Sequence, residues 1–313
     1  MTLRTRLAPS PTGALHLGNA RTFLINAALA AQSGGRARLR VDDLDGPRVK
    51  AGAAEGAIED LRWLGIEWDL PAIYQSRRTQ RYQVVAHDLI KRGLAYWCDC
   101  PRSKVADESP GPAADGGLIY GGFCRERPDP PSPDDAALRF RLDGEAAFED
   151  EVLGPQHASA DKLGDFVIVK RFGEIGYHLA SVIDDIDFGI DFILRGEDLL
   201  ASTLRQIFLY RALGQGAQLP RFAHVPLVVG TDGLKLAKRH GDTRLAQLRE
   251  EGVTAGRVRA VLARWSGFEP SADEIEFDEW AERFDLDRLP REPVVYDDAR
   301  DRRRLFGGQG VGG

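Results

Sequence analysis

The residues Ala8–Asn19 constrain the fold of this chain more than any other stretch, because they force it from a strand through a turn into a helix. Two prolines and a glycine prevent the strand from continuing: Pro9, Pro11 and Gly13. Gly18 then allows a ligand to approach the backbone at the start of the predicted helix. His16 and free backbone N–H groups at a helix N-terminus predict a binding site for polyphosphate, although a surface loop with an unrelated histidine fits equally well.

The residues around this turn alternate between strand and helix patterns. Apolar and alternating stretches predict strands over Thr5–Ala8 and Arg36–Val41, and helical spacing predicts helices over Asn19–Ser33, Gly52–Gly65 and Arg77–Arg92. Such alternation is typical of an α/β fold with a Rossmann-type parallel sheet, where ligands bind at the carboxyl ends of the strands. His16 and Asp42 both follow predicted strands.

The pattern changes after residue 95. Turn-rich stretches and short strands predict an insertion over 96–165, between a first half (1–95) and a second half (166–225) of the catalytic sheet domain. Apolar strand patterns return at Phe166–Val169 and Phe192–Leu194, and a helix is predicted over Leu199–Leu213. Residues 226–313 are predicted to form a lysine-bearing loop and a helical domain, with a disordered glycine-rich tail from about 307.

Composition excludes several classes of protein. The net charge of −6 excludes a uniformly basic nucleic-acid coat but not a local basic face. The sequence contains no recognisable secretion signal and no apolar run of membrane-spanning length, so we expect a cytoplasmic protein with no membrane partner.

The three cysteines, Cys98, Cys100 and Cys124, are odd in number and lie in the predicted insertion. This argues against a disulfide framework and favours a structural zinc site that needs a fourth ligand. Three free, buried cysteines are the alternative.

A second segment with candidate catalytic side chains follows the turn Gly230–Gly233. Its sequence is Lys235-Leu-Ala-Lys238-Arg239. Alone it fits a solvated basic turn. Together with the segment at His16 it resembles the paired signature sequences of the class I aminoacyl-tRNA synthetases, in which a histidine loop and a lysine loop bind ATP.

Five segments in order resemble the glutamyl-tRNA synthetase family over nearly the whole chain. They are Arg6–Gly13, His16–Gly18, Arg40–Asp45, Tyr177–Ala180 and Lys235–Arg239. The chain ends near the point where full-length members continue into anticodon-binding domains. This resembles the short, zinc-bearing members, which place glutamate on the queuosine base at the wobble position of tRNA(Asp).

The resemblance implies a ligase that activates L-glutamate with ATP and Mg²⁺ and transfers it to that tRNA. A truncated enzyme that charges the 3′ end of tRNA(Glu) remains an alternative, as does a non-catalytic tRNA-binding paralogue. We expect a monomer with one structural zinc ion.

The resemblance also implies roles for individual residues. The catalytic residues are His16 and Lys238. The expected ATP-binding residues are His16, Gly18, Asn19, Asp198, Lys235 and Lys238. The expected glutamate-binding residues are Arg6, Ala8, Ser10, Asp42, Tyr177 and Arg195. Two positions depart from the family pattern: Ala237 replaces the usual serine, and Asp42 replaces the glutamate common in bacterial relatives, which leaves glutamine specificity open.

In the queuosine-specific members the fourth zinc ligand is a tyrosine four residues before the last cysteine, and Tyr120 stands there. Glu126 is the alternative, because phenolate is an uncommon zinc ligand. For RNA contact the sequence offers arginine clusters, which also fit solvated faces: Arg77, Arg78 and Arg81; Arg244, Arg249, Arg257, Arg259 and Arg264; Arg300 and Arg302–Arg304. A tRNA substrate favours the C-terminal helical unit as the docking surface.

Overall fold

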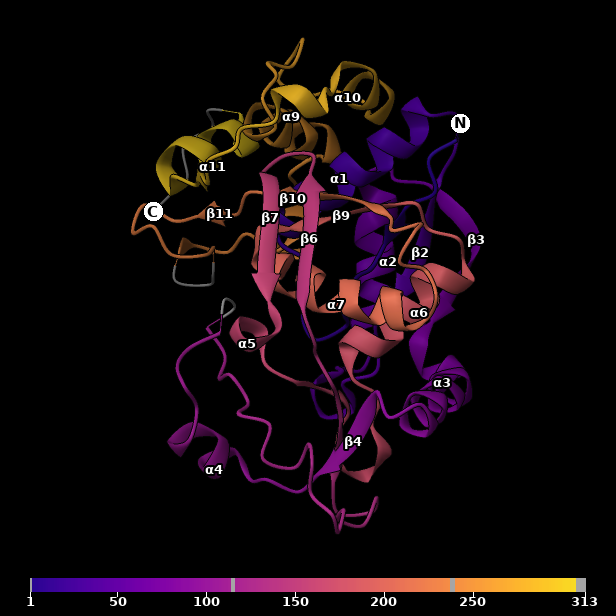
Figure 1. The fold of residues 1–313 in the computed structure, drawn as a ribbon. Coiled ribbons are helices and arrows are strands. Elements are labelled where there is room, and N and C mark those ends of the chain that lie inside the picture. Colours follow the sequence, from indigo (N-terminus) through magenta and orange to yellow (C-terminus); the bar gives the residue numbers. More distant parts are fainter. Residues whose placement is uncertain (1, 114–115, 237–239, 308–313) are drawn as a thin grey trace. The chain divides into compact units, whose positions relative to one another are not determined.

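The computed structural model describes residues 2–113, 116–236 and 240–307 (Figure 1). They form two compact units. The first contains Met1–Ile73, Phe192–Glu197 and Ala223–Gly313, and the second contains Tyr74–Asp191 and Asp198–Phe222. These boundaries do not coincide with the expected ones at 95, 165 and 225, so the four-part division stays a prediction.

The first unit is built on parallel strands. β1 (Arg6–Leu7) pairs with β2 (Ala37–Val41), and Arg6 lies opposite Arg38. The other side of β1 faces β9 (Phe192–Gly196), whose first amide donates a hydrogen bond to the carbonyl of Arg4 at 3.2 Å. The outer neighbours are β3 (Trp68–Tyr74) beside β2 and β10 (Arg221–Val225) beside β9. The predicted parallel α/β character is confirmed.

Helix α1 (Leu17–Gln32) connects β1 to β2, as a parallel pair requires. Its alanines and leucines at helical spacing are buried, and Gly34 ends it in the left-handed conformation, with φ 77°. α1 packs on β1 and β9 and on two C-terminal helices, α9 (Ala255–Trp265) and α10 (Phe277–Arg283). The predicted helix is confirmed, but it begins two residues earlier than expected because His16 caps it.

The remaining elements of the first unit are mostly helical. They are α2 (Ala53–Trp63), β11 (Val228–Val229), α8 (Leu245–Glu250), α9 (Ala255–Trp265), α10 (Phe277–Arg283), β12 (Val294–Val295) and α11 (Asp298–Phe306). β11 and β12 pair in parallel. The predicted apolar face of α9 is confirmed, since Val258, Val261, Leu262 and Trp265 are all buried. Of the glycine-rich tail predicted from about residue 307, residues 308–313 lie outside the described residues.

The second unit contains two small antiparallel arrangements and several helices. β4 (Ala95–Cys98), β5 (Ala137–Phe140) and β8 (Phe166–Val169) form one sheet. β6 (Glu145–Asp150) and β7 (Gly154–Ser159) form a hairpin, seen as two neighbouring arrows in Figure 1. The helices are α3 (Thr79–Lys91), α4 (Arg102–Asp107), α5 (Ala160–Leu163), α6 (Tyr177–Asp187) and α7 (Leu200–Ala212).

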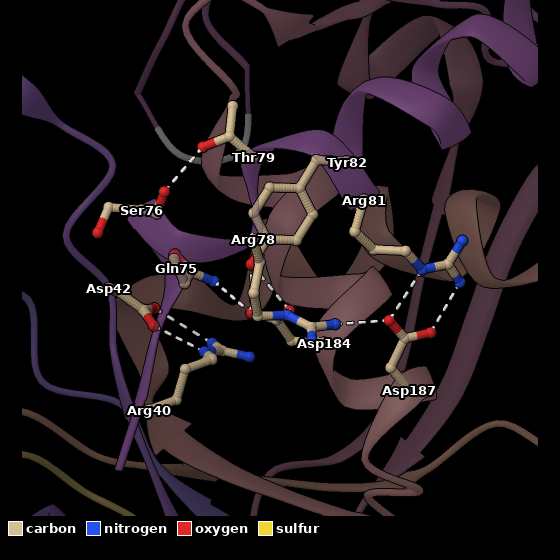
Figure 2. A network of polar contacts seen from close by, with 10 residues as sticks. All are labelled: Arg40, Asp42, Gln75, Ser76, Arg78, Thr79, Arg81, Tyr82, Asp184 and Asp187. Atoms are coloured by element: carbon tan, nitrogen blue, oxygen red, sulfur yellow. Dashed lines mark hydrogen bonds and ion pairs between the residues drawn. The ribbon is translucent and has the colours of Figure 1, made fainter.

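Buried Asp184 ties α6 to the start of α3. Its carboxylate accepts hydrogen bonds from Gln75 Nε2 at 2.9 Å, Arg78 Nε at 2.7 Å and the Tyr82 hydroxyl at 2.8 Å (Figure 2). Arg78 also bonds Asp187. This cluster fixes the helix that carries Tyr177, because every polar atom of a fully buried carboxylate must find a partner.

None of the helices in the described part of the chain combines the length and the apolar character that a membrane span needs.

Candidate active site

His16 is held in place by a reciprocal capping arrangement at the start of α1. Its Nδ1 accepts a hydrogen bond from the amide of Gly18 at 3.2 Å, and its own amide donates to Asn19 Oδ1 at 3.3 Å. A Cβ atom at Gly18 would lie only 3.1 Å from His16 Cε1, so glycine is needed for the ring to fold over the helix end. Because Nδ1 accepts, the neutral ring carries its hydrogen on Nε2, where it can donate to a phosphate oxygen.

The first two amides of α1, which were expected to be free for phosphate, are occupied. Gly18 N donates to His16, and Leu17 N donates to the carbonyl of Thr243 at 3.1 Å. This corrects the expectation of free N–H groups there: a phosphate could contact the amide of Gly18 only if the His16 ring left it. The imidazole therefore replaces the backbone as the first expected donor.

The histidine loop contacts the segments on both sides of the lysine signature. His16 forms an antiparallel bridge with Arg244, and Leu245 N donates to the carbonyl of Leu15 at 2.9 Å. Before the lysine signature, Val228 lies next to Gly18: a Cβ atom placed on Gly18 would be 3.8 Å from Val228 Cβ. Val228 is in turn bonded to the signature, because Leu236 N donates to its carbonyl at 2.9 Å.

The histidine loop thus lies beside the residues that flank the lysine signature, more than 200 positions further along the chain. Lys235 lies beside Val229 in a short hairpin that begins at β11. Lys238, together with Ala237 and Arg239, lies outside the described residues.

The expected glutamate-binding arginines lie at neighbouring strands of the first unit. Arg6 in β1 and Arg195 in β9 are 4% and 5% exposed. Arg6 Nη1 donates to the carbonyl of Leu194 at 3.3 Å, and Asn26 Nδ2 of α1 donates to the carbonyl of Arg6 at 2.8 Å. Asn26 Nδ2 also donates to the carbonyl of Leu194 at 3.4 Å and so joins β1 to β9. Asn26 was not predicted as a site residue, because a polar residue within an apolar helix stripe gives no indication of its partner.

Asp42 follows β2, and its amide donates to the carbonyl of Pro9 at 3.0 Å, which places the proline turn against the end of the strand. The carboxylate is paired with Arg40 through two parallel hydrogen bonds, Nε to Oδ1 at 2.7 Å and Nη2 to Oδ2 at 3.1 Å (Figure 2). Both side chains are nearly buried. Arg40 was not predicted as a site residue, although its position two residues before Asp42 on a strand puts both on one face.

The other expected site residues are more exposed. In the first unit, Ala8 is half-buried and Ser10 is exposed. In the second, Tyr177 is the first residue of α6 and 36% exposed, and Asp198 lies in the exposed turn that precedes α7.

The cysteine cluster brings four donor atoms together in the second unit. The sulfur atoms of Cys98, Cys100 and Cys124 lie within 4.8 Å of one another. The Tyr120 hydroxyl lies 3.3 Å from Cys98 Sγ and 3.6 Å from Cys100 Sγ, and it accepts a hydrogen bond from the amide of Cys124. Glu126, the alternative ligand, is exposed and bonds Arg141 at 2.6 Å instead. The donor set with Tyr120 therefore fits a zinc ion.

The electrostatics around the cluster favour an anion only at Cys98, because burial raises the pKa of both Cys100 and Tyr120. The Arg139 guanidinium lies 3.8 Å from the centre of the Tyr120 ring. Burial opposes ionisation of Cys98, but its hydrogen bonds with Tyr120 and Arg139 and the charge of Arg139 outweigh burial and lower the pKa of this thiol. Burial raises the pKa of Cys100 to about 11, which indicates that this thiol stays protonated until a cation replaces the proton.

Most of the arginines proposed for RNA contact are engaged with acidic partners. Arg78 and Arg81 bind Asp187, and Arg244 binds Asp242. The pairs in the C-terminal helices are Arg249–Asp60, Arg257–Glu274, Arg259–Glu276, Arg264–Glu269, Arg300–Asp301, Arg302–Glu251 and Arg304–Asp301. Arg259 is buried, so it serves the fold rather than a docking surface.

The chain is similar in sequence to known proteins over most of its length. The chain is 43% identical to the glutamyl-Q tRNA(Asp) synthetase of Symbiobacterium thermophilum over 92% of this chain and 94% of the relative. It is 41% identical to the enzyme of the same name from Rhodopirellula baltica, over 94% and 96%. The glutamate–tRNA ligase of Magnetococcus marinus is 37% identical, but the chain covers only 63% of its length.

A crystal structure of a glutamate tRNA ligase from Elizabethkingia meningosepticum, in complex with its amino acid, superposes with a TM-score of 0.81 at 27% identity. The superposition covers 97% of this chain and 69% of the ligase chain. The family model for tRNA synthetases class I (E and Q), catalytic domain, matches residues 2–299. The chain therefore belongs to the class I tRNA synthetases of the E and Q type, and it is a ligase of that family.

Proposed function

We propose that this enzyme activates L-glutamate with ATP and transfers the glutamyl group to the queuosine base at the wobble position of tRNA(Asp). The observation that carries the proposal is the set of contacts between the histidine loop and both flanks of the lysine signature. These contacts support the proposal, because the family resemblance assigns ATP binding to both segments. Two relatives that match over nearly their whole length carry the glutamyl-Q tRNA(Asp) synthetase name.

Activation requires positioning and charge neutralisation rather than covalent help from the protein. A carboxylate oxygen of glutamate attacks the α-phosphorus of ATP, and pyrophosphate leaves with its electron pair. His16 Nε2 would donate to a phosphate oxygen, while Lys238, Lys235 and the Mg²⁺ of the nucleotide would balance the developing charge. A nucleophile on the modified base then attacks the adenylate carbonyl and releases AMP.

Glutamate carries two carboxylates and one ammonium group, and the first unit offers matching charges. The planar forks of Arg6 and Arg195 suit carboxylates. Asp42 would accept the ammonium, although Arg40 already balances its charge, so this contact supplies hydrogen-bond geometry more than net attraction. Ser10 and Ala8 complete the part of the proposed pocket that lies in the first unit, and Gly18 and Asn19 complete its part of the nucleotide site. Tyr177 and Asp198 lie in the second unit, and their roles stay predictions from the family resemblance.

The proposed zinc ion would be held by Cys98, Cys100, Cys124 and Tyr120. Four protein donors leave no open position, so the ion would crosslink the loops around β4 without taking part in the reaction.

Charging of the 3′ end of tRNA(Glu) is the second candidate, because glutamate–tRNA ligases at 37–39% identity match the same residues. One experiment separates the two. Glutamate-dependent ATP–pyrophosphate exchange is measured first without tRNA, and transfer is then measured to queuosine-containing tRNA(Asp) and to tRNA(Glu). We expect exchange and transfer to tRNA(Asp) only.

Lys238→Ala should abolish exchange, whereas Lys50→Ala, at an exposed lysine on a different loop, should leave it unchanged. Absence of exchange in the wild-type protein would refute the enzymatic proposal. Exclusive charging of tRNA(Glu) would refute the queuosine acceptor but not the activation step.

A further inference from the structure

Phe172 is held in an unfavourable conformation at the tip of a tight hairpin in the second unit. Among the described residues it is the single non-glycine residue with a positive φ, at 64°. The left-handed region is costly for a bulky side chain, because Cβ crowds the carbonyl oxygen. The same ring is 85% exposed. The fold thus gains neither relaxed backbone nor buried surface from this residue, a combination that indicates a role in binding.

The hairpin holds this residue firmly. Lys170 N donates to the carbonyl of Glu174 at 2.7 Å, and Val169 bridges to Ile175, which is buried. Arg171 Nη2 donates to the carbonyl of Asp99 at 2.6 Å, which ties the tip to the cysteine loop. The ring is therefore presented by a well-connected turn.

The surroundings of the ring favour a nucleic acid base over a protein surface. The described residues that flank it at the tip, Lys170, Arg171, Gly173 and Glu174, are charged or glycine, so these neighbours do not extend the ring into an apolar patch of the kind that protein partners use. Arg171 is bonded to a neutral carbonyl oxygen and forms no ion pair with an acidic side chain in the described structure, in contrast to the arginines of the C-terminal helices. Within the described residues no other ring stacks on Phe172, and an aromatic face beside an uncompensated cation matches an unpaired base and its phosphate.

We infer that Phe172 is a stacking platform for an unpaired nucleobase of the tRNA, with Arg171 beside it to contact the phosphate backbone. The inference rests on the proposed function in that it assumes a tRNA substrate. It does not depend on which tRNA accepts the glutamyl group.

The test compares two substitutions at this position. Phe172→Asn removes the ring but suits the left-handed conformation, which asparagine tolerates. Phe172→Trp keeps an aromatic face. The dissociation constant is measured by fluorescence anisotropy with labelled transcripts of tRNA(Asp) and tRNA(Glu) at one fixed salt concentration, without glutamate or ATP. Val84→Asn, at another exposed apolar residue of the same unit, is the matched control.

We expect Phe172→Asn to weaken binding of the preferred transcript about 5- to 100-fold, the range typical of one stacked base. Phe172→Trp and Val84→Asn should stay within about threefold of the wild type, as an intact stacking face and an unrelated position imply. The melting temperature of Phe172→Asn should be equal to or above that of the wild type, whereas a structural role would lower it.

Unchanged binding by Phe172→Asn would overturn the inference, as would equal weakening by Phe172→Trp. A change in oligomeric mass on substitution would assign the ring to a contact between copies instead. If the wild type shows no pyrophosphate exchange but Phe172→Asn still weakens tRNA binding, the proposed function fails and the stacking site stands. If exchange is normal and binding is unaffected, the stacking site alone fails.

Discussion

Arg40 determines how Asp42 can act, because the two parallel hydrogen bonds fix the carboxylate plane (Figure 2). Arg40→Lys keeps the positive charge but cannot form two parallel bonds. The proposed ammonium contact would then lose its orientation. We predict that the KM for glutamate in pyrophosphate exchange rises about tenfold, while kcat changes less than about threefold, as expected for a ground-state binding contact.

Arg36→Lys is the matched control for this substitution. Arg36 precedes the same strand, is exposed, and pairs with Glu67 on the surface. Surface pairs contribute little, so its kinetics should match the wild type. An unchanged glutamate KM in Arg40→Lys, or an equal rise in Arg36→Lys, would contradict the positioning role of Arg40.

Asp60 gives the molecule a pH-dependent weakness. Burial raises its pKa from 3.8 to about 6, and attraction to Arg249 only partly offsets this. The nearest Arg249 nitrogen is 3.6 Å from Oδ1, too far for a hydrogen bond. A carboxyl whose pKa is higher in the folded state binds its proton more tightly there. Stability from this group is therefore present below about pH 4 and is lost as the pH rises towards about 6.

Asp60→Asn should consequently stabilise the protein at pH 7.5, by about 1 kcal/mol once solvent screening is allowed for. Urea denaturation at several pH values measures this. The gain should disappear towards pH 4, where the folded wild type carries a neutral carboxyl. A gain of the same size at both pH values would show that the charge of Asp60 is not its cause.

At the scale of elements, the sequence predicts what local patterns encode. α1, β2, α2 and α7 lie within about two residues of their predicted bounds, since apolar spacing and end signals agree there. β3 is not predictable in this way, because Asp69 and Pro71 interrupt its pattern. In α6 the apolar stripe is broken by Asp184, whose burial depends on partners from residues 75–82.

Gly164 connects α5 to β8 and allows the chain to pass close to Tyr120. A Cβ there would lie 2.8 Å from Tyr120 N, and φ is 68°. Gly164→Ala should therefore displace Tyr120 and lower both stability, by about 2 kcal/mol or more, and bound zinc. Gly144→Ala is the matched control, since Gly144 has φ 79° with nothing near its hypothetical Cβ.

Calorimetry and metal analysis of the two alanine variants separate backbone strain from crowding. Gly144→Ala should lose only the stability associated with the positive φ and retain its zinc. If both variants lose stability equally and keep their metal, the close approach to Tyr120 has no role in the cysteine cluster.

At the scale of the whole molecule, the order of motifs along the chain carries more information than any single one. The five segments indicate the family, and the structure joins the histidine loop to the flanks of the lysine signature. The sequence could not predict that the first amides of α1 are occupied, that Arg40 engages Asp42, or that the C-terminal arginines are neutralised. Each of these depends on partners brought in by tertiary contacts.

The division into two units leads to a prediction about metal removal. The four proposed zinc donors all belong to the second unit, and the His16 cap and the buried arginines of the proposed pocket belong to the first. Without the ion, three closely spaced thiols keep only weak mutual contacts, and the loops on either side of β4 lose their crosslink. We expect amide hydrogen exchange to rise in the peptides covering 95–107 and 118–127, because local opening there needs less free energy.

Peptides from α1 and β2 should exchange at their original rates, since their hydrogen bonds lie within the first unit. The measurement compares the purified protein, the chelated protein and the chelated protein with zinc restored. The third sample should recover the protection of the first, which separates metal loss from irreversible damage. An equal rise in α1 would mean that the ion stabilises the activation site as well, and no rise in 95–107 would rule out a structural ion at the cysteines.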